Sequence, residues 1–233
     1  MNLVKAKLPV VLALICVASF VTFLQVEANQ ETDDPISAAA VWAPDGDALT
    51  EIQQRCQSET SVPYSQCFVD QMGSFASSEA VGFTQSLLDQ TPARVGYLSG
   101  LREAGPVDLG LVAYPGRPGV TPGWALVNGA PAVVNVDDLG RLPQSTMEKD
   151  SQFNLLRAKY PKIMLAIENA ERTDNLPPME AQGEGSLRFV ITYSLKEPCA
   201  ACKAVGYARF GFDFDAAGKF LGTKFIGVNP ATP

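Results

Sequence analysis

Two close pairs of cysteines constrain this chain of 233 residues more than any other feature. Cys56 and Cys67 are separated by a short polar segment, and Cys199 and Cys202 enclose two alanines. Four cysteines allow three pairings, and we predict the local one, because the members of each pair lie close in the chain. Such disulfides require an oxidising compartment, since thiols in the cytosol are kept reduced.

The N-terminus fits that requirement. Lys5 and Lys7 form a short basic start, residues 8–24 are apolar and uncharged, and small residues flank Glu27. A basic start, an apolar stretch and a small-residue exit are the parts of a secretory signal. We therefore expect residues 1–28 to be a signal peptide. The apolar stretch is close to the shortest that spans a bilayer, so an uncleaved N-terminal anchor is the alternative.

The first part of the expected domain is helical. Residues 29–44 are polar and then small, which predicts a flexible tether. In residues 45–90, apolar side chains recur at helical spacing and predict a helical hairpin followed by a third helix at about 78–90. Cys56 lies near the end of the first predicted helix and Cys67 near the start of the second. A disulfide there would join the hairpin at its turn and stabilise it by about 2–3 kcal/mol.

Local sequence signals predict a turn, a short helix and a loop in the middle of the chain. Asn128-Gly129 between two apolar runs predicts a two-residue hairpin turn, because both turn positions need a positive φ. Asp150 or Ser151 is expected to cap a short helix over 152–160. Residues 168–185 contain several glycines, prolines and charged side chains and are expected to form a surface loop.

The C-terminal residues show the clearest pattern. Large apolar side chains alternate with polar or small ones in 187–194 and 208–214, and a third apolar stretch covers 220–228. This period of two predicts strands with one buried face, and the short turns between them predict a three-stranded antiparallel meander. Residues 94–233 are thus mainly β-structure with one short helix. We predict for 45–233 a single α+β domain, with the helices packed on a mainly antiparallel sheet.

Several catalytic and metal-binding classes are disfavoured. Histidine is absent, which removes the usual general base and the commonest transition-metal ligand. Asp137 and Asp138 are neighbours after a strand and would point to opposite faces, so we expect a cap or turn there. Asp213 and Asp215 resemble the start of a calcium loop, but Lys224 stands where that loop needs a glutamate. We predict no metal and no cofactor, and a hydrolase that uses carboxylates alone is the weakest hypothesis.

The Cys199–Cys202 pair has more than one interpretation. Haem attachment would need a histidine where Lys203 stands. A redox-active pair of the thioredoxin type lies at a helix N-terminus. Here an alternating strand precedes the pair and another follows it, so we predict a structural disulfide in a hairpin turn. Redox activity is the alternative, because Lys196 and Lys203 flank the pair and would favour a thiolate.

Aromatic and basic residues of the sheet are candidates for a binding surface. Tyr207 and Arg209 share the strand face opposite the phenylalanines, and such residues often anchor protein interfaces. The full set of candidates is Trp124, Lys203, Tyr207, Arg209, Lys219 and Lys224.

Charge and layout complete the functional expectation. The net charge of −7 disfavours nucleic acids and anionic lipid surfaces and suits a basic protein or small ligand. A signal, an antiparallel sheet and a cysteine-clipped loop together resemble periplasmic lysozyme inhibitors. In that family the cysteines bracket a polar segment, whereas here they bracket only Ala200 and Ala201, so no residue role follows.

We therefore expect a periplasmic or secreted, disulfide-stabilised binding or inhibitory module without catalytic activity. A thiol–disulfide redox protein using Cys199 and Cys202 is the alternative. We expect contact with a membrane only through an uncleaved N-terminal segment.

Overall fold

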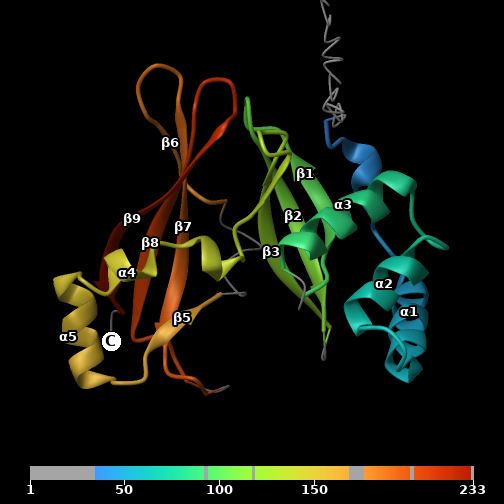
Figure 1. Cartoon of the computed structure of the whole chain (residues 1–233), viewed down its shortest axis with the longest axis horizontal. Helices are drawn as coiled ribbons and strands as arrows, with labels where there is room; N and C mark the ends of the chain where they lie inside the picture. The colour runs from blue at the N-terminus through green and yellow to red at the C-terminus, as the bar shows by residue number, and fades with distance from the viewer. Residues whose placement is uncertain (1–34, 92–93, 117–118, 168–175, 200–201, 232–233) are drawn as a thin grey trace, which may run out of the picture. The chain divides into compact units, whose positions relative to one another are not determined.

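The protein has an α+β fold with two antiparallel sheets (Figure 1). The computed structural model describes residues 35–91, 94–116, 119–167, 176–199 and 202–231, and Asp34–Pro233 form one compact unit. The predicted signal or anchor and the first residues of the predicted tether lie outside the described residues. No helix in the described part is long and apolar enough to cross a membrane.

Helices come first along the chain and strands follow. The helical elements are η1 (Ala38–Ala40), α1 (Gly46–Ser58), α2 (Tyr64–Met72), α3 (Ser78–Gln90), η2 (Leu139–Arg141), α4 (Gln144–Met147) and α5 (Ser151–Lys159). The first sheet has the order β1 (Tyr97–Arg102), β2 (Asp108–Pro115), β3 (Val120–Val127), β4 (Val133–Asn135). The second has the order β5 (Met164–Ala166), β7 (Leu187–Lys196), β8 (Gly206–Phe214), β9 (Phe220–Pro230), and β6 (Met179–Ala181) also pairs with β7.

Side-chain caps start the predicted helices. The Asp45 side chain accepts a hydrogen bond from the Ala48 amide at the start of α1. The Ser77 side chain accepts one from the Ala80 amide at the start of α3. Asp150 accepts from the Phe153 amide and begins α5, as predicted. These caps satisfy amides that have no partner inside the helix. The helical hairpin, the third helix and the short helix are therefore confirmed.

The predicted tether is wrong for residues 35–44. Ala40 and Trp42 are buried, and the Trp42 amide donates to the Leu98 carbonyl of β1 at 2.8 Å. The Trp42 ring packs edge-on against Tyr97, with 4.8 Å between ring centroids. Burial of the indole ring contributes part of the apolar area that offsets the entropy lost when this segment is ordered.

Two sheets replace the single sheet that the sequence suggested. β3 turns Trp124 and Leu126 toward the second sheet, while Ala125 and Val127 face η1 and α3. A sheet that is apolar on both faces needs a partner on each side. The helices η1 and α1–α3 cover one face of the first sheet, and the second sheet covers the other (Figure 1).

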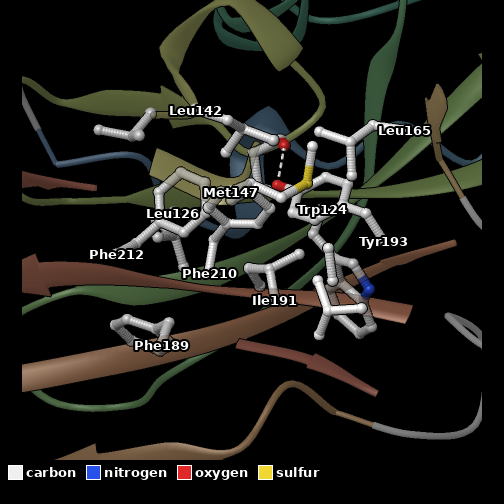
Figure 2. Packing of buried hydrophobic residues seen from close by; sticks show 14 of the residues in the cluster. Trp124, Leu126, Leu142, Met147, Leu165, Phe189, Ile191, Tyr193, Phe210 and Phe212 are labelled. Carbon is white, nitrogen blue, oxygen red and sulfur yellow. Dashed lines mark hydrogen bonds between the residues drawn. The ribbon is translucent and has the colours of Figure 1, made fainter. Parts of the chain in front are cut away.

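The core between the sheets contains aromatic rings from the second sheet. Phe189, Tyr193 and Phe210 belong to one cluster with Trp124 and Leu126 (Figure 2). The Tyr193 hydroxyl donates to the Val136 carbonyl across this layer. α4 and α5 contribute side chains to the same cluster, so they cover the inner face of the second sheet.

The Asn128-Gly129 hairpin exists, but its loop is longer than predicted. Asn128 has a φ of 66°, yet the first strand pair after the loop is Val127 with Val133. Ala130 instead exchanges hydrogen bonds with the β8–β9 turn: its amide donates to Gly218, and its carbonyl accepts from Phe220. These bonds hold the loop against the second sheet, so β4 cannot start directly after Gly129.

The meander of β7, β8 and β9 is confirmed. Its second turn also forms as predicted, because Asp215 accepts hydrogen bonds from the Ala217 and Lys219 amides and Gly218 has a φ of 79°. The loop expected over 168–185 contains the short strand β6, and its residues 168–175 lie outside the described residues.

Candidate binding face

The second sheet has one buried face and one outer face. On β7, the odd-numbered residues 189–195 join the core between the sheets. The even-numbered residues 188–196 form the opposite, outer face, on which Val190 and Ser194 are buried and Thr192 is exposed. On β8, Tyr207, Arg209, Gly211 and Asp213 lie on the outer face, because the residues between them are in the core. Directly paired residues of β5 and β9 extend this face. Its side chains divide into two halves.

The first half contains paired charges. Arg188 donates two hydrogen bonds to the carboxylate of Asp213, at 2.6 and 2.9 Å, and the Lys224 ammonium lies 3.1 Å from the same carboxylate. Gly211 makes room for this contact, since a Cβ there would lie 2.7 Å from the Arg188 side chain. The Arg188 hydrogen bonds, assisted by Lys224, lower the pKa of Asp213. We call Arg188, Asp213 and Lys224 the ion-paired half.

The second half lies toward the β7–β8 turn. Arg209 faces Thr192 on β7 and Gly227 on β9, and Lys196 faces Met164 on β5. Thr192 is exposed, Met164 is 51% exposed, and Arg209 and Lys196 are half-buried. Among the described residues, neither Arg209 nor Lys196 forms an ion pair.

Tyr207 lies between these two cations, paired across the strands with Ser194 and Asn229. In this row, Ser194 is buried, Tyr207 is half-buried and Asn229 is exposed. We call the group Met164, Thr192, Lys196, Tyr207, Arg209 and Asn229 the basic half.

The structure separates the predicted binding residues. Tyr207 and Arg209 are in the basic half, and Lys203 is exposed in the turn beside it. Lys224 is in the ion-paired half, and Lys219 is exposed in the β8–β9 turn, outside both halves. The prediction that Trp124 is exposed is wrong: it is 3% exposed and packs between the two sheets (Figure 2). Sequence reasoning missed Met164, because its strand is too short to show an alternating pattern.

Both predicted disulfide pairings are confirmed. Cys56–Cys67 joins α1 to α2 with 5.5 Å between the Cα atoms. Cys199–Cys202, with 5.3 Å between the Cα atoms, lies in the turn between β7 and β8. The Val205 amide returns to the Leu195 carbonyl at 2.8 Å and closes the turn. The described residues around this second pair form strands and a turn, which is the environment predicted for a structural disulfide.

A buried polar cluster lies under the C-terminus of α3 and was not predicted. The Arg94 guanidinium lies 3.7 Å from the centroid of the Tyr114 ring and 3.8 Å from the Asp137 carboxylate. The Tyr114 hydroxyl donates to the Asn135 side chain at 3.3 Å. Burial, with a smaller effect of Asp137, raises the pKa of Tyr114. The members come from two strands, β2 and β4, and from the loops that follow α3 and β4, so only strand pairing brings them together.

Asp137 and Asp138 have separate environments, as expected for neighbours. Asp138 accepts a hydrogen bond from the Gly140 amide at 3.0 Å and starts η2. The Asp137 side chain is 1% exposed and faces Arg94. These two carboxylates therefore do not meet at one substrate, and the carboxylate-only hydrolase gains no support from them.

Neither a groove beside α1 and α2 nor the carboxylates and cysteines of the described residues form a charged or metal-binding site. The groove is open, has a volume of about 320 Å³ and is lined by Gln53, Gln57, Tyr64, Pro115 and Gly116, none of which is charged. In the described part of the chain, no cluster of three or more cysteines and carboxylates is placed to hold a metal ion. Searches against protein-family models, curated proteins and solved structures found no match to this chain.

Proposed function

We propose that this protein is an exported, disulfide-stabilised binding module without catalytic activity, acting in the periplasm or as a secreted protein. The two disulfides support this, since such bonds persist in oxidising compartments. The predicted signal segment agrees with the same compartment. Inhibition of a partner would be one form of such binding.

The observation that carries the proposal is the outer face of the second sheet. It presents Tyr207 and Arg209 from a paired central strand, so the backbone that holds them is fixed by hydrogen bonds on both sides. Tyrosine and arginine are enriched among the residues that dominate binding energy. The two carboxylates considered for catalysis have separate structural environments instead: Asp137 faces Arg94, and Asp138 starts η2.

The alternative is a thiol–disulfide redox protein, and Cys199 is exposed enough to permit it. The turn position favours a structural bond, because no described residue places a helix dipole at the pair. We expect a reduction potential below about −300 mV for Cys199–Cys202. A readily reduced pair, together with partner proteins trapped as mixed disulfides by C202S, would favour the redox function instead.

A pair of photocrosslinkers tests the binding function. A benzophenone amino acid is placed at Thr192 on the outer face or at Gln54, an exposed residue of α1, in cells that naturally make the protein. We expect the probe at Thr192 to capture a discrete partner that the probe at Gln54 does not capture. The purified partner should also shift the amide NMR signals of Thr192 and Arg209. Identical products from both probes, or no shift of these signals, would contradict the proposal.

A further inference from the structure

We propose that the basic half binds an extended acidic segment of a protein partner through its carboxylates. This inference rests on the proposed binding function and adds the chemistry of the partner. It also reverses the expectation that an acidic protein selects a basic target, because this face has the opposite sign to the whole chain.

The first argument is the uneven distribution of charge on the outer face. In the ion-paired half, Asp213 neutralises Arg188 and contacts Lys224. In the basic half, the residues directly opposite Arg209 are Thr192 and Gly227, which carry no charge. The chain as a whole has a net charge of −7, so these cations form a local exception. Charge complementarity of this kind steers association and selects partners.

The second argument is spacing. Arg209 on β8 is opposite Thr192 on β7. Lys196 lies on β7, four residues after Thr192. Four residues of strand correspond to about 13 Å. Two carboxylates four residues apart in an extended peptide have the same separation, so each could meet one cation. A single phosphate group is too small to reach both positions at once.

The third argument is the apolar and aromatic surface between the cations. Met164 and Tyr207 lie in the basic half, and a side chain at Gly227 would meet no atom within 4 Å, which leaves space beside Arg209. Methionine, tyrosine and arginine are enriched in protein interfaces. This composition favours a peptide over a lipid headgroup.

The test uses the full chain, expressed with its own N-terminus, isolated with both disulfides formed and labelled with ¹⁵N. Two ten-residue peptides of serine and threonine are titrated, one with glutamates at positions 3 and 7 and one with glutamines there. We expect the glutamate peptide to shift the amide signals of Thr192, Lys196 and Arg209, and to bind about tenfold more tightly than the glutamine peptide. No shift at millimolar glutamate peptide, or equal shifts with both peptides, would overturn the proposal.

A matched pair of variants identifies the site. R209E and K219E change the net charge equally, but Lys219 lies in the β8–β9 turn, away from the basic half. We expect R209E to weaken binding about tenfold or more and K219E to leave it nearly unchanged, with both spectra showing a folded protein. Equal weakening by both variants would overturn the proposal, because it would indicate non-specific attraction.

Other occupants are separate outcomes of the same titration. Inorganic phosphate or phosphatidylglycerol vesicles that shift the same amides as strongly as the glutamate peptide would overturn the proposal. So would tighter peptide binding by E168Q/E171Q/D174N, since a segment of this chain would then compete for the face. A partner captured at Thr192 with no glutamate-peptide binding would contradict this inference and leave the binding function standing.

Discussion

Asp213 balances the charges in the ion-paired half, so its removal has a predictable cost. D213N leaves Arg188 and Lys224 without their anion, and we expect the free energy of unfolding at pH 7 to fall by about 2 kcal/mol. Urea denaturation measures this. D70N removes an exposed carboxylate of α2 and is the control, with an expected change within about 0.5 kcal/mol.

The same residue gives a pH dependence with a defined sign. The pKa of Asp213 is lowered in the folded protein, so its contribution to stability is present above the unfolded-state pKa of about 4. That contribution is lost as the pH falls through the lower, folded-state pKa. We therefore expect the stability difference between wild type and D213N to shrink below about pH 4. An unchanged difference at pH 3 and pH 7 would contradict this.

Gly123 is required by the buried polar cluster. A Cβ at this position would lie 2.4 Å from the Asp137 carboxylate and 2.4 Å from the Tyr114 ring. We expect G123A to lower the free energy of unfolding by about 1–3 kcal/mol, because both neighbours are buried and held in place. G82A is the matched control: Gly82 is exposed within α3 with no atom near its Cβ, and alanine there should stabilise by about 0.5–1 kcal/mol.

An alternating sequence pattern predicts which face a residue occupies only when one face of the strand is buried and the other is not. Tyr207 and Arg209 were placed correctly, because the phenylalanines of β8 alternate with them. Trp124 was misplaced, since both faces of β3 are covered and every residue from Gly123 to Val127 is buried. The contact of Arg94 with Tyr114 and Asp137 depends on strand pairing, which no local pattern encodes.

At the level of elements, the two disulfides should differ in their effect. Cys56 and Cys67 are 11 residues apart and buried, whereas Cys199 and Cys202 are three residues apart. Closing the longer loop removes more entropy from the unfolded chain, so we expect C56A/C67A to cost about 2–3 kcal/mol or more. We expect C199A/C202A to lower the free energy of unfolding by less than C56A/C67A does. Thermal unfolding of the two double variants compares them, and the reverse order would contradict this account.

The helices were predictable because their signals are local. Asp45, Ser77 and Asp150 cap their own helices within three residues, and the apolar spacing follows from the sequence alone. The Asn128 loop was predicted with the wrong length, because its Ala130 pairs with a turn about 90 residues further along the chain. Local turn propensity cannot anticipate such a contact.

At the scale of the whole molecule, the described body should unfold in one step. The two tryptophans report on different layers, since Trp42 packs with α1 and α2 and Trp124 packs between the sheets. Asp34–Pro233 form one compact unit, and single domains usually unfold cooperatively. We expect the single-tryptophan variants W42F and W124F each to show the same unfolding midpoint by fluorescence and by circular dichroism. Separate midpoints for the two methods in either variant would show that the layers unfold independently.

The layered arrangement explains why the outer face of the second sheet is the best candidate for function. The first sheet is covered on both faces, and the inner face of the second is covered by the first sheet with α4 and α5. The cations of the basic half are therefore presented on the one sheet face that no described core cluster covers.

The central claim is that a partner binds this outer face, and calorimetric titration with the partner captured at Thr192 tests it most directly. The account predicts that K219E binds this partner with the affinity of the wild type. It predicts that R209E binds at least about tenfold more weakly. Equal affinities for wild type, K219E and R209E would contradict it.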